Sequence, residues 1–440
     1  MGSFAAHVEN AIAHHRAGRL DEAEAAYRAA LVLAPGHAAV AHNLGVVVAT
    51  KGDHVAALAC FDRVIADQPD YASAHYNRAI ALAASGRTGE AIAGFRRTCL
   101  LEPGHYDSHR ALGFLCLQEG DRGRALDHFA RTYELRRGED RTGMAASSLT
   151  SATSGKLRHD ADQFRYLASR RREGKRFEML ARVYENIAGD LPANSTVLDR
   201  DQLETLGDDY NPAIHIAAAP EASGSAVSQR LDARAITQAF NGDGCGAVWF
   251  DGLLAETALS SLRRFLLEST IWHDFDHIGG FVASYLEDGL ACPLLLQIAD
   301  ELRTRFPDVL RAHPLSQAWA FKGLTPEAAV DAHADDGAIS VNFWVTPDAA
   351  NLDRDGGGGL RICRAAPPAA WQISGYVSDM AEIAAFLDDH RSDTMVVPYR
   401  ENRAAMFQSR LFHRSDAPRF AKGYANHRIN VTLLFGRHAA

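Results

Sequence analysis

Three residues in the C-terminal half have the types and spacing needed to hold a metal ion. His333 and Asp335 are two residues apart and stand shortly before an apolar run, residues 339–345, that predicts a β-strand. Alternate residues of an extended chain face the same way, so this imidazole and this carboxylate can bind one ion. His413 ends a second strand-like run, residues 404–412, and supplies another imidazole.

Two imidazoles and one carboxylate form the donor set with which non-haem iron(II) enzymes bind one face of the ion and leave the other positions open. We therefore predict an iron site at His333, Asp335 and His413 and treat all three as catalytic. The same donors also suit zinc or manganese in a barrel without oxygenase activity. A dead site or a purely structural network is the remaining alternative.

A His-x-acid pair is by itself weak support for a metal site, because the chain has 20 histidines and 55 acidic residues. Two other such pairs occur, His7 with Glu9 and His105 with Asp107. Both fall in the repeats described below, where a solvated helix surface or a repeat turn explains them. Only the third pair is followed by a strand and by a further histidine.

Arg428 opens another apolar run, residues 429–435, that predicts a core strand. A guanidinium at this place is costly unless it has a buried partner, and its planar fork binds a carboxylate through two hydrogen bonds. A dicarboxylic co-substrate with a keto-acid group can chelate iron at that end and present its far carboxylate to Arg428. We expect Asn430 and Thr432 on the side of Arg428 and His427 on the other.

Short strand-like runs separated by turn signals fill the chain after residue 315. A strand at residues 246–250 and two amphipathic helices, residues 255–269 and 293–306, precede them. Helices followed by many short strands predict a jelly-roll or cupin-like barrel with helical buttresses.

Residues 246–437 resemble the 2-oxoglutarate and iron(II)-dependent oxygenases, with a distant likeness to prolyl and aspartyl/asparaginyl hydroxylases. The resemblance rests on His333-x-Asp335, His413 and Arg428 in that order, and on the glycine-rich turn at residues 356–360. It implies a double-stranded β-helix barrel, iron(II) and 2-oxoglutarate, and hydroxylation of a C–H bond coupled to decarboxylation. Asp335 argues against the halogenases of this family, which lack that carboxylate.

The chain departs from the family pattern in two places. The interval between His413 and Arg428 is longer than usual, which implies an extra loop near residues 420–426. The tyrosine that prolyl hydroxylases place upstream of the ligand pair is not found, since residues 318–322 read Ala-Trp-Ala-Phe-Lys. The secondary contacts of the co-substrate therefore stay unassigned.

Four columns of residues recur with a 34-residue period near the N-terminus. They are glycine (Gly18, Gly52, Gly86, Gly120), alanine (Ala23, Ala57, Ala91, Ala125), an aromatic ring (Tyr27, Phe61, Phe95, Phe129) and proline (Pro35, Pro69, Pro103). Glycine suits a turn between helices, alanine a close helix contact, the ring a gap between repeats, and proline a helix end. The pattern resembles the tetratricopeptide repeat family over about residues 4–137, with Arg137 in the last proline position.

A tetratricopeptide array implies an all-α solenoid with a concave platform for a peptide or a partner protein. A spacer or a self-association module is the alternative. The repeats supply no catalytic chemistry in either case.

The chain between the two regions predicts a linker and a helical cap. Residues 138–155 are small and polar, residues 156–190 have helical spacing of apolar side chains, and residues 191–232 predict an irregular connection. We therefore expect a multidomain chain: a four-repeat tetratricopeptide solenoid at 1–137, a linker and cap at 138–232, and a double-stranded β-helix oxygenase domain with buttressing helices at 233–440.

Composition disfavours several classes of protein. A length of 440 residues exceeds one ordinary domain, and a net charge of −9 argues against a general nucleic-acid binder. The six cysteines include no CxxC pair, which disfavours a zinc–cysteine or disulfide framework and suits a reducing compartment. No signal-peptide-like segment and no run of 18 apolar residues occurs, so we expect a cytoplasmic protein without a membrane span or membrane partner.

The resulting hypothesis is an iron(II) and 2-oxoglutarate-dependent dioxygenase that hydroxylates a side chain of a protein or peptide recruited by the repeats. Two alternatives stay open. One is a small-molecule oxygenase whose repeats serve assembly, and the other is a non-enzymatic repeat scaffold with a degenerate barrel.

Overall fold

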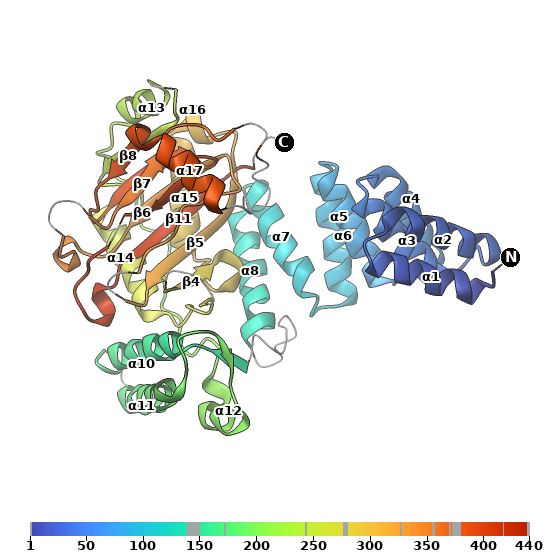
Figure 1. Ribbon diagram of the computed structural model, residues 1–440, viewed down its shortest axis with the longest axis horizontal. Coiled ribbons are helices and arrows are strands. Elements are labelled where there is room, and N and C mark those ends of the chain that lie inside the picture. Colours follow the sequence, from blue (N-terminus) through green and yellow to red (C-terminus); the bar gives the residue numbers. More distant parts are fainter. Residues whose placement is uncertain are drawn as a thin grey trace. The chain divides into compact units, whose positions relative to one another are not determined.

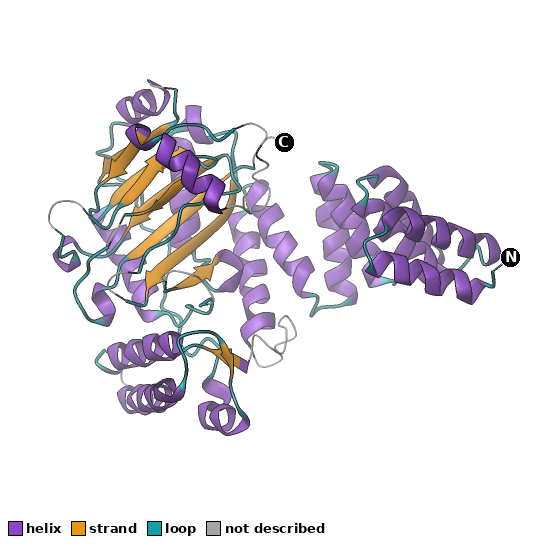
Figure 2. Ribbon diagram, viewed as in Figure 1, coloured by secondary structure: helices purple, strands orange, loops and turns teal. Residues whose placement is uncertain are grey.

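The computed structural model describes residues 2–138, 150–170, 173–242, 244–275, 280–325, 328–353, 357–368, 371, 380–416 and 418–437. The chain divides into two compact units, Met1–Leu115 and Cys116–Ala440. The described part of the first unit is helical, whereas all of the strands lie in the second (Figure 2). An all-helical repeat region followed by a sheet-rich region is thus confirmed. The predicted boundaries at residues 137 and 232 stay predictions.

The repeat helices follow one another in pairs. They are α1 (Phe4–Arg16), α2 (Leu20–Leu33), α3 (Ala38–Thr50), α4 (His54–Asp67), α5 (Ala72–Ala84), α6 (Thr88–Leu101), α7 (Tyr106–Gln118) and α8 (Arg122–Arg137). The four glycines of the repeat column have φ between 71° and 88°, the left-handed region that favours glycine, in the turn within each pair. Asp53 and Asp121 follow two of these glycines and cap the next helix with their carboxylates. The alanine and aromatic columns are buried, as the period predicts.

Two antiparallel sheets of the second unit have three or more strands. One has six strands in the order β3-β9-β6-β11-β5-β4, and the other has three in the order β10-β7-β8. The strands are β3 (Ala247–Asp251), β4 (Phe281–Tyr285), β5 (Leu315–Gly323), β6 (Ile339–Trp344), β7 (Leu360–Cys363), β8 (Thr394–Val397), β9 (Arg403–Gln408), β10 (His413–Ser415) and β11 (Ile429–Phe435). Each strand-like run predicted after residue 315 coincides with one of them. Among the described residues neither sheet closes on itself, so the double-stranded β-helix barrel is not confirmed.

The predicted helices of the second unit also form. The helices α14 (Glu256–Glu268) and α15 (Pro293–Arg305) bury the apolar faces expected of residues 255–269 and 293–306. A further helix, α17 (Met380–Asp389), lies in front of the sheets in Figure 1 and packs through Ile383 against Cys363 and Phe412. This helix closes the outer side of the small sheet.

The predicted helical cap consists of α10 (Ser154–Ala168) and α11 (Gly174–Asp190), which pack on each other around a core of their own (Figure 1). A two-stranded sheet, β1 (Ser151–Ala152) with β2 (Thr196–Val197), and α12 (Arg200–Leu206) complete this part. Gln163 of α10 donates hydrogen bonds to the carbonyls of Leu267 and Ser269, so the helix pair is attached to the sheet-rich unit. Residues 139–149 of the predicted linker lie outside the described residues.

No helix within the described ranges is both long enough and apolar enough to cross a lipid bilayer.

Candidate metal centre

Backbone pairing brings the two predicted histidine ligands together. His333 lies on the extended segment before β6, and His413 is the first residue of β10. The His333 amide donates to the His413 carbonyl at 3.0 Å, and the His413 amide donates back at 2.8 Å. The Asp335 amide donates to the Ser409 carbonyl at 2.9 Å. Main-chain hydrogen bonds therefore set the separation of side chains that are 80 positions apart.

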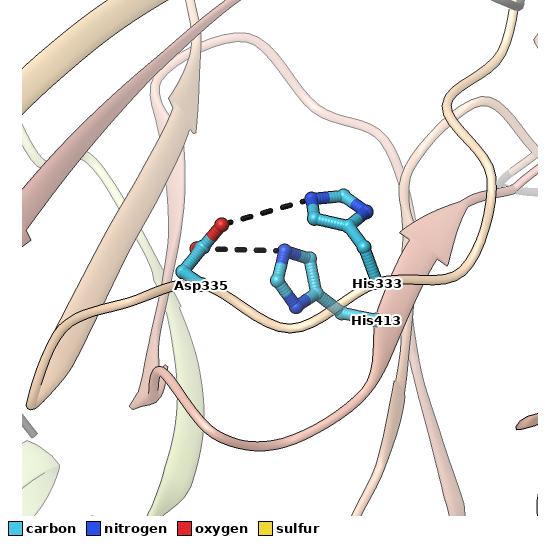
Figure 3. Close-up of side chains that lie close together, drawn as sticks. All are labelled: His333, Asp335 and His413. Atoms are coloured by element: carbon cyan, nitrogen blue, oxygen red, sulfur yellow. Dashed lines mark ion pairs between the residues drawn. The ribbon is translucent and has the colours of Figure 1, made fainter. Parts of the chain in front are cut away.

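The three side chains point toward one another (Figure 3). Asp335 Oδ1 is 3.7 Å from His333 Nε2, and Asp335 Oδ2 is 3.6 Å from His413 Nε2. One potential ligand atom from each residue lies within 4.8 Å of the other two. Atoms that each bind one ion at about 2.1 Å are themselves about 3–4 Å apart, so the cluster has the dimensions of a metal site.

The ring orientations of both histidines suit metal binding. His333 Nδ1 is 2.7 Å from the Asp331 carbonyl, and His413 Nδ1 is 3.0 Å from the Leu411 carbonyl. A carbonyl only accepts hydrogen bonds, so Nδ1 carries the proton and the Nε2 lone pair faces Asp335. Burial, reinforced by the neighbouring His333, lowers the pKa of His413 to about 4, so its imidazole is neutral at pH 7. A neutral imidazole whose other nitrogen donates to a carbonyl is the usual metal-ligating form.

Asp335 is buried and is held by a side chain that the sequence did not single out. Ser340 Oγ donates to Asp335 Oδ2 at 2.7 Å, and Ser340 Oγ lies 2.9 Å from Ser409 Oγ. Two imidazoles and one oriented carboxylate fit a divalent transition metal, and the donor set suits iron, zinc or manganese.

Arg428, the predicted co-substrate anchor, lies immediately before β11 and is 8% exposed. Its Nε donates to the Gly358 carbonyl at 2.8 Å, Nη1 to Ser415 Oγ at 3.2 Å and Nη2 to the Gly359 carbonyl at 3.2 Å. Burial lowers its pKa to about 10, so the guanidinium is still a cation at pH 7. Within the described part of the chain it forms no ion pair with a carboxylate. A buried cation without a counter-charge is unfavourable and suits an anionic ligand.

Arg428, His333 and His413 line one narrow cavity between the two sheets. Asp335 does not line the cavity itself but lies next to both histidines, so the structure brings all four predicted site residues to one region. Of the residues in the glycine-rich turn, Gly356 lies outside the described residues. His427 is not among the residues that line the cavity, in line with the strand alternation.

The polar wall of this cavity is formed by neighbouring strands. Asn342 of β6 lies opposite Thr432 of β11 and donates to its hydroxyl at 2.8 Å. Asn430 and Thr432 line the cavity together with Arg428, as expected from their alternate positions. Asn342 was not among the predicted site residues, although a polar residue inside the apolar run 339–345 is a signal for such a position.

Two aromatic rings line the cavity, whereas Arg403 and His105 have partners elsewhere. Trp319 and Phe321 of β5 are half-buried and line the cavity. Arg403 is buried but forms an ion pair with two hydrogen bonds to the exposed Asp251, and it does not line the cavity. His105 accepts a hydrogen bond from the Ser108 amide at the start of α7, so the His105/Asp107 pair belongs to a repeat turn.

Comparisons with known proteins concern the repeats. Residues 3–38 and 42–99 match the model of the tetratricopeptide repeat family, so the first unit contains tetratricopeptide repeats. MamA, residues 41 to the end, from Desulfovibrio magneticus RS-1 is 25% identical, with 31% of this chain and 78% of that one covered and a TM-score of 0.30. Another MamA crystal structure is 18% identical over 42% of this chain and 90% of that one, with a TM-score of 0.29.

The first tetratricopeptide domain of Spaghetti (RPAP3), bound to an HSP90 peptide, is 19% identical, with 27% of this chain and 93% of that one covered and a TM-score of 0.26. None of the curated proteins compared with the chain matches it. The family match ends before the sheets begin.

Proposed function

We propose that the second unit is an iron(II) and 2-oxoglutarate-dependent oxygenase. The observation that carries the proposal is one cavity lined by both histidines of a two-histidine, one-carboxylate cluster and by a buried arginine without an acidic partner among the described residues. The cluster alone suits several metals, and the arginine alone suits many anions. Together they match a ligand that is a chelator at one end and a carboxylate at the other.

The strand order supports a double-stranded β-helix for this unit. The His333 segment pairs with β10, which extends the small sheet to the order His333 segment, β10, β7, β8. The cavity lies between this sheet and the central strands β6 and β11 of the large sheet. The three proposed ligands lie at one end of the small sheet. Arg428 immediately precedes β11 of the large sheet and lines the same cavity.

Each residue of the site has a distinct role in the proposed reaction. His333, Asp335 and His413 would hold the ion, and Arg428 would bind the far carboxylate of 2-oxoglutarate. Iron(II), when bound, supplies the oxygen chemistry that couples decarboxylation of 2-oxoglutarate to hydroxylation of a C–H bond. The rings of Trp319 and Phe321 keep water away from the cavity walls, which strengthens the electrostatic contact of Arg428 with its ligand.

We further propose that the repeats recruit a protein or peptide substrate. A fifth column with the 34-residue period supports this role, because the first helix of each pair presents an apolar side chain at the same position: Ile12, Val46, Ile80 and Phe114. None of the four is fully buried, and Ile80 is 41% exposed. A regular row of accessible apolar side chains suits an extended peptide. A small-molecule oxygenase with repeats used for assembly, and a scaffold with a degenerate barrel, are the competing functions.

The test of the enzymatic proposal is 2-oxoglutarate turnover by the purified full chain under aerobic conditions with added iron(II). We expect succinate to form, and we expect His333→Ala and Asp335→Ala to abolish it. His7→Ala, which changes the histidine of a surface pair on α1, is the matched control and should leave turnover unchanged. Undiminished succinate formation by both ligand variants would show that the site assignment is wrong.

The recruitment proposal is tested by mass spectrometry of a cell lysate treated with the active chain. Peptides heavier by one oxygen atom should appear, and Ile80→Asp together with Val46→Asp should remove them without reducing basal 2-oxoglutarate turnover. If the same peptides are modified equally by this variant, the repeats do not select the substrate.

A further inference from the structure

Two buried serines form a hydrogen-bonded chain that ends on Asp335. Ser340 on β6 and Ser409 just after β9 are both 0% exposed. Ser340 Oγ is 2.7 Å from Asp335 Oδ2 and 2.9 Å from Ser409 Oγ. The Asp335 amide also donates to the Ser409 carbonyl, so the segment before β6 is tied to Ser409 through both main chain and side chains.

The direction of this chain follows from the chemistry of the groups. An ionised carboxylate only accepts hydrogen bonds. The Ser340 hydroxyl, which has one proton, must therefore donate its hydrogen bond to Asp335 Oδ2. The contact between the two hydroxyls then requires Ser409 to be the donor and Ser340 the acceptor. The result is a one-way relay from Ser409 through Ser340 to Asp335, in which each donation strengthens the next.

The relay acts on the carboxylate oxygen that faces His413. Asp335 Oδ2 is 3.6 Å from His413 Nε2, while Oδ1 is 3.7 Å from His333 Nε2. A hydrogen bond to Oδ2 fixes the rotation of the carboxylate, so that each oxygen stays opposite one imidazole.

We propose that Ser340 and Ser409 are positioning residues of the metal centre, which set the metal affinity and the ligand field of Asp335 without touching the ion. This inference rests on the proposed metal site. Removing a group that hydrogen bonds to a metal-binding side chain, without itself binding the ion, commonly weakens metal affinity by about 10–100-fold.

The experiment measures cobalt(II) binding by the full chain, because cobalt(II) reports both affinity and ligand geometry through its visible absorption. Ser340→Ala should weaken binding by about 10–100-fold and change the absorption spectrum. Ser340→Thr keeps the hydroxyl and should restore most of the affinity. Ser409→Ala should have a smaller effect, and the double variant should bind no more weakly than Ser340→Ala, because Ser409 acts only through Ser340.

Ser284→Ala is the matched control, since Ser284 is 1% exposed on β4 and its hydroxyl donates to a main-chain carbonyl. It should leave cobalt(II) affinity and spectrum unchanged. Melting temperatures measured without metal separate loss of folding from loss of binding.

Three outcomes would overturn the inference. If Ser340→Ala binds cobalt(II) with the affinity and spectrum of the wild type while His333→Ala abolishes binding, the relay is rejected and the proposed metal site is retained. If Ser340→Ala and Ser284→Ala lose the same amount of cobalt(II) affinity, Ser340 and Ser409 contribute only to general packing of the core. No cobalt(II) binding by the wild-type chain rejects the relay and the proposed metal site together.

Discussion

Arg137 and Asp288 form a buried ion pair with two hydrogen bonds, of 2.9 and 2.6 Å, although 151 positions separate them. Both side chains are 4% exposed. Arg137 ends α8, and Asp288 ends the short turn that follows β4. Nearby, the Tyr133 hydroxyl of α8 is hydrogen bonded to His273 Nε2 at 2.8 Å. The last helix with the repeat pattern is therefore fastened to the edge of the large sheet.

Arg137→Ala should destabilise the second unit. The substitution leaves the Asp288 carboxylate buried without its main partner, which typically costs about 3–5 kcal/mol. Arg136, whose Nε is 3.8 Å from Asp288 Oδ2, should recover part of this loss. Urea unfolding measures the change, and Arg131→Ala, which removes an exposed pair with Glu134, should change stability by less than about 1 kcal/mol. Equal free energies of unfolding for Arg137→Ala and Arg131→Ala would show that the buried pair of Arg137 and Asp288 does not stabilise the second unit.

The position of α8 also predicts how the chain tolerates truncation. A chain that starts at residue 116 keeps the whole second compact unit and should fold with a cooperative thermal transition. A chain that starts at residue 138 loses Tyr133 and Arg137 and should melt at a lower temperature or fail to accumulate. Circular dichroism melting compares the two. A fully stable chain from residue 138 would mean that α8 is dispensable for the sheets.

Metal addition should stabilise the second unit. A ligand that binds only the folded state at 100 times its dissociation constant adds about 2.7 kcal/mol to the free energy of unfolding. Manganese(II), which does not require anaerobic handling, should therefore raise the melting temperature, and a chelator should reverse the increase. His413→Ala should abolish this response, whereas His75→Ala, at a histidine bonded to the Pro69 carbonyl within the repeats, should retain it.

Arg428→Gln should weaken 2-oxoglutarate binding without weakening metal binding. Hydrogen bonds to a charged group contribute about 1.5–3 kcal/mol, which corresponds to about a 10–100-fold higher dissociation constant. Calorimetry of the manganese-loaded chain with 2-oxoglutarate measures the change. Arg403 is the matched buried arginine, 7% exposed but paired with Asp251. Arg403→Gln should lower stability and leave the 2-oxoglutarate affinity of the folded protein unaltered.

Acid should destabilise the second unit through His159 of α10. Burial lowers the pKa of His159 to about 3 despite the Asp160 carboxylate at 3.0 Å. Between this value and the ordinary histidine pKa the unfolded state binds the proton more tightly, so stability falls as the pH is lowered through that window. The slope is at most about 1.4 kcal/mol per pH unit for one group. Urea unfolding at pH 7, 6 and 5 should show the decrease, and His159→Phe should make the decrease smaller, with the buried His413 and His273 accounting for part of the remainder.

The repeats and the His333-x-Asp335 pair were predictable from the sequence because both are short-range patterns. A glycine, an alanine and a ring that recur every 34 residues depend only on local helix packing, and the structure has them in the expected turns and cores. His333 and Asp335 are related by the two-residue alternation of an extended chain. The same alternation put Asn430 and Thr432 on the side of Arg428 before the cavity was known.

Only the tertiary structure decided which distant residues meet. His413 faces His333 because main-chain hydrogen bonds pair their segments, and Ser409 reaches Ser340 because β6 and β9 are neighbours in the sheet. The Arg137 and Asp288 pair likewise depends on α8 packing against the turn after β4. Periodicity fixes the face on which a side chain lies, whereas strand pairing and helix docking are non-local choices that leave no regular spacing in the chain.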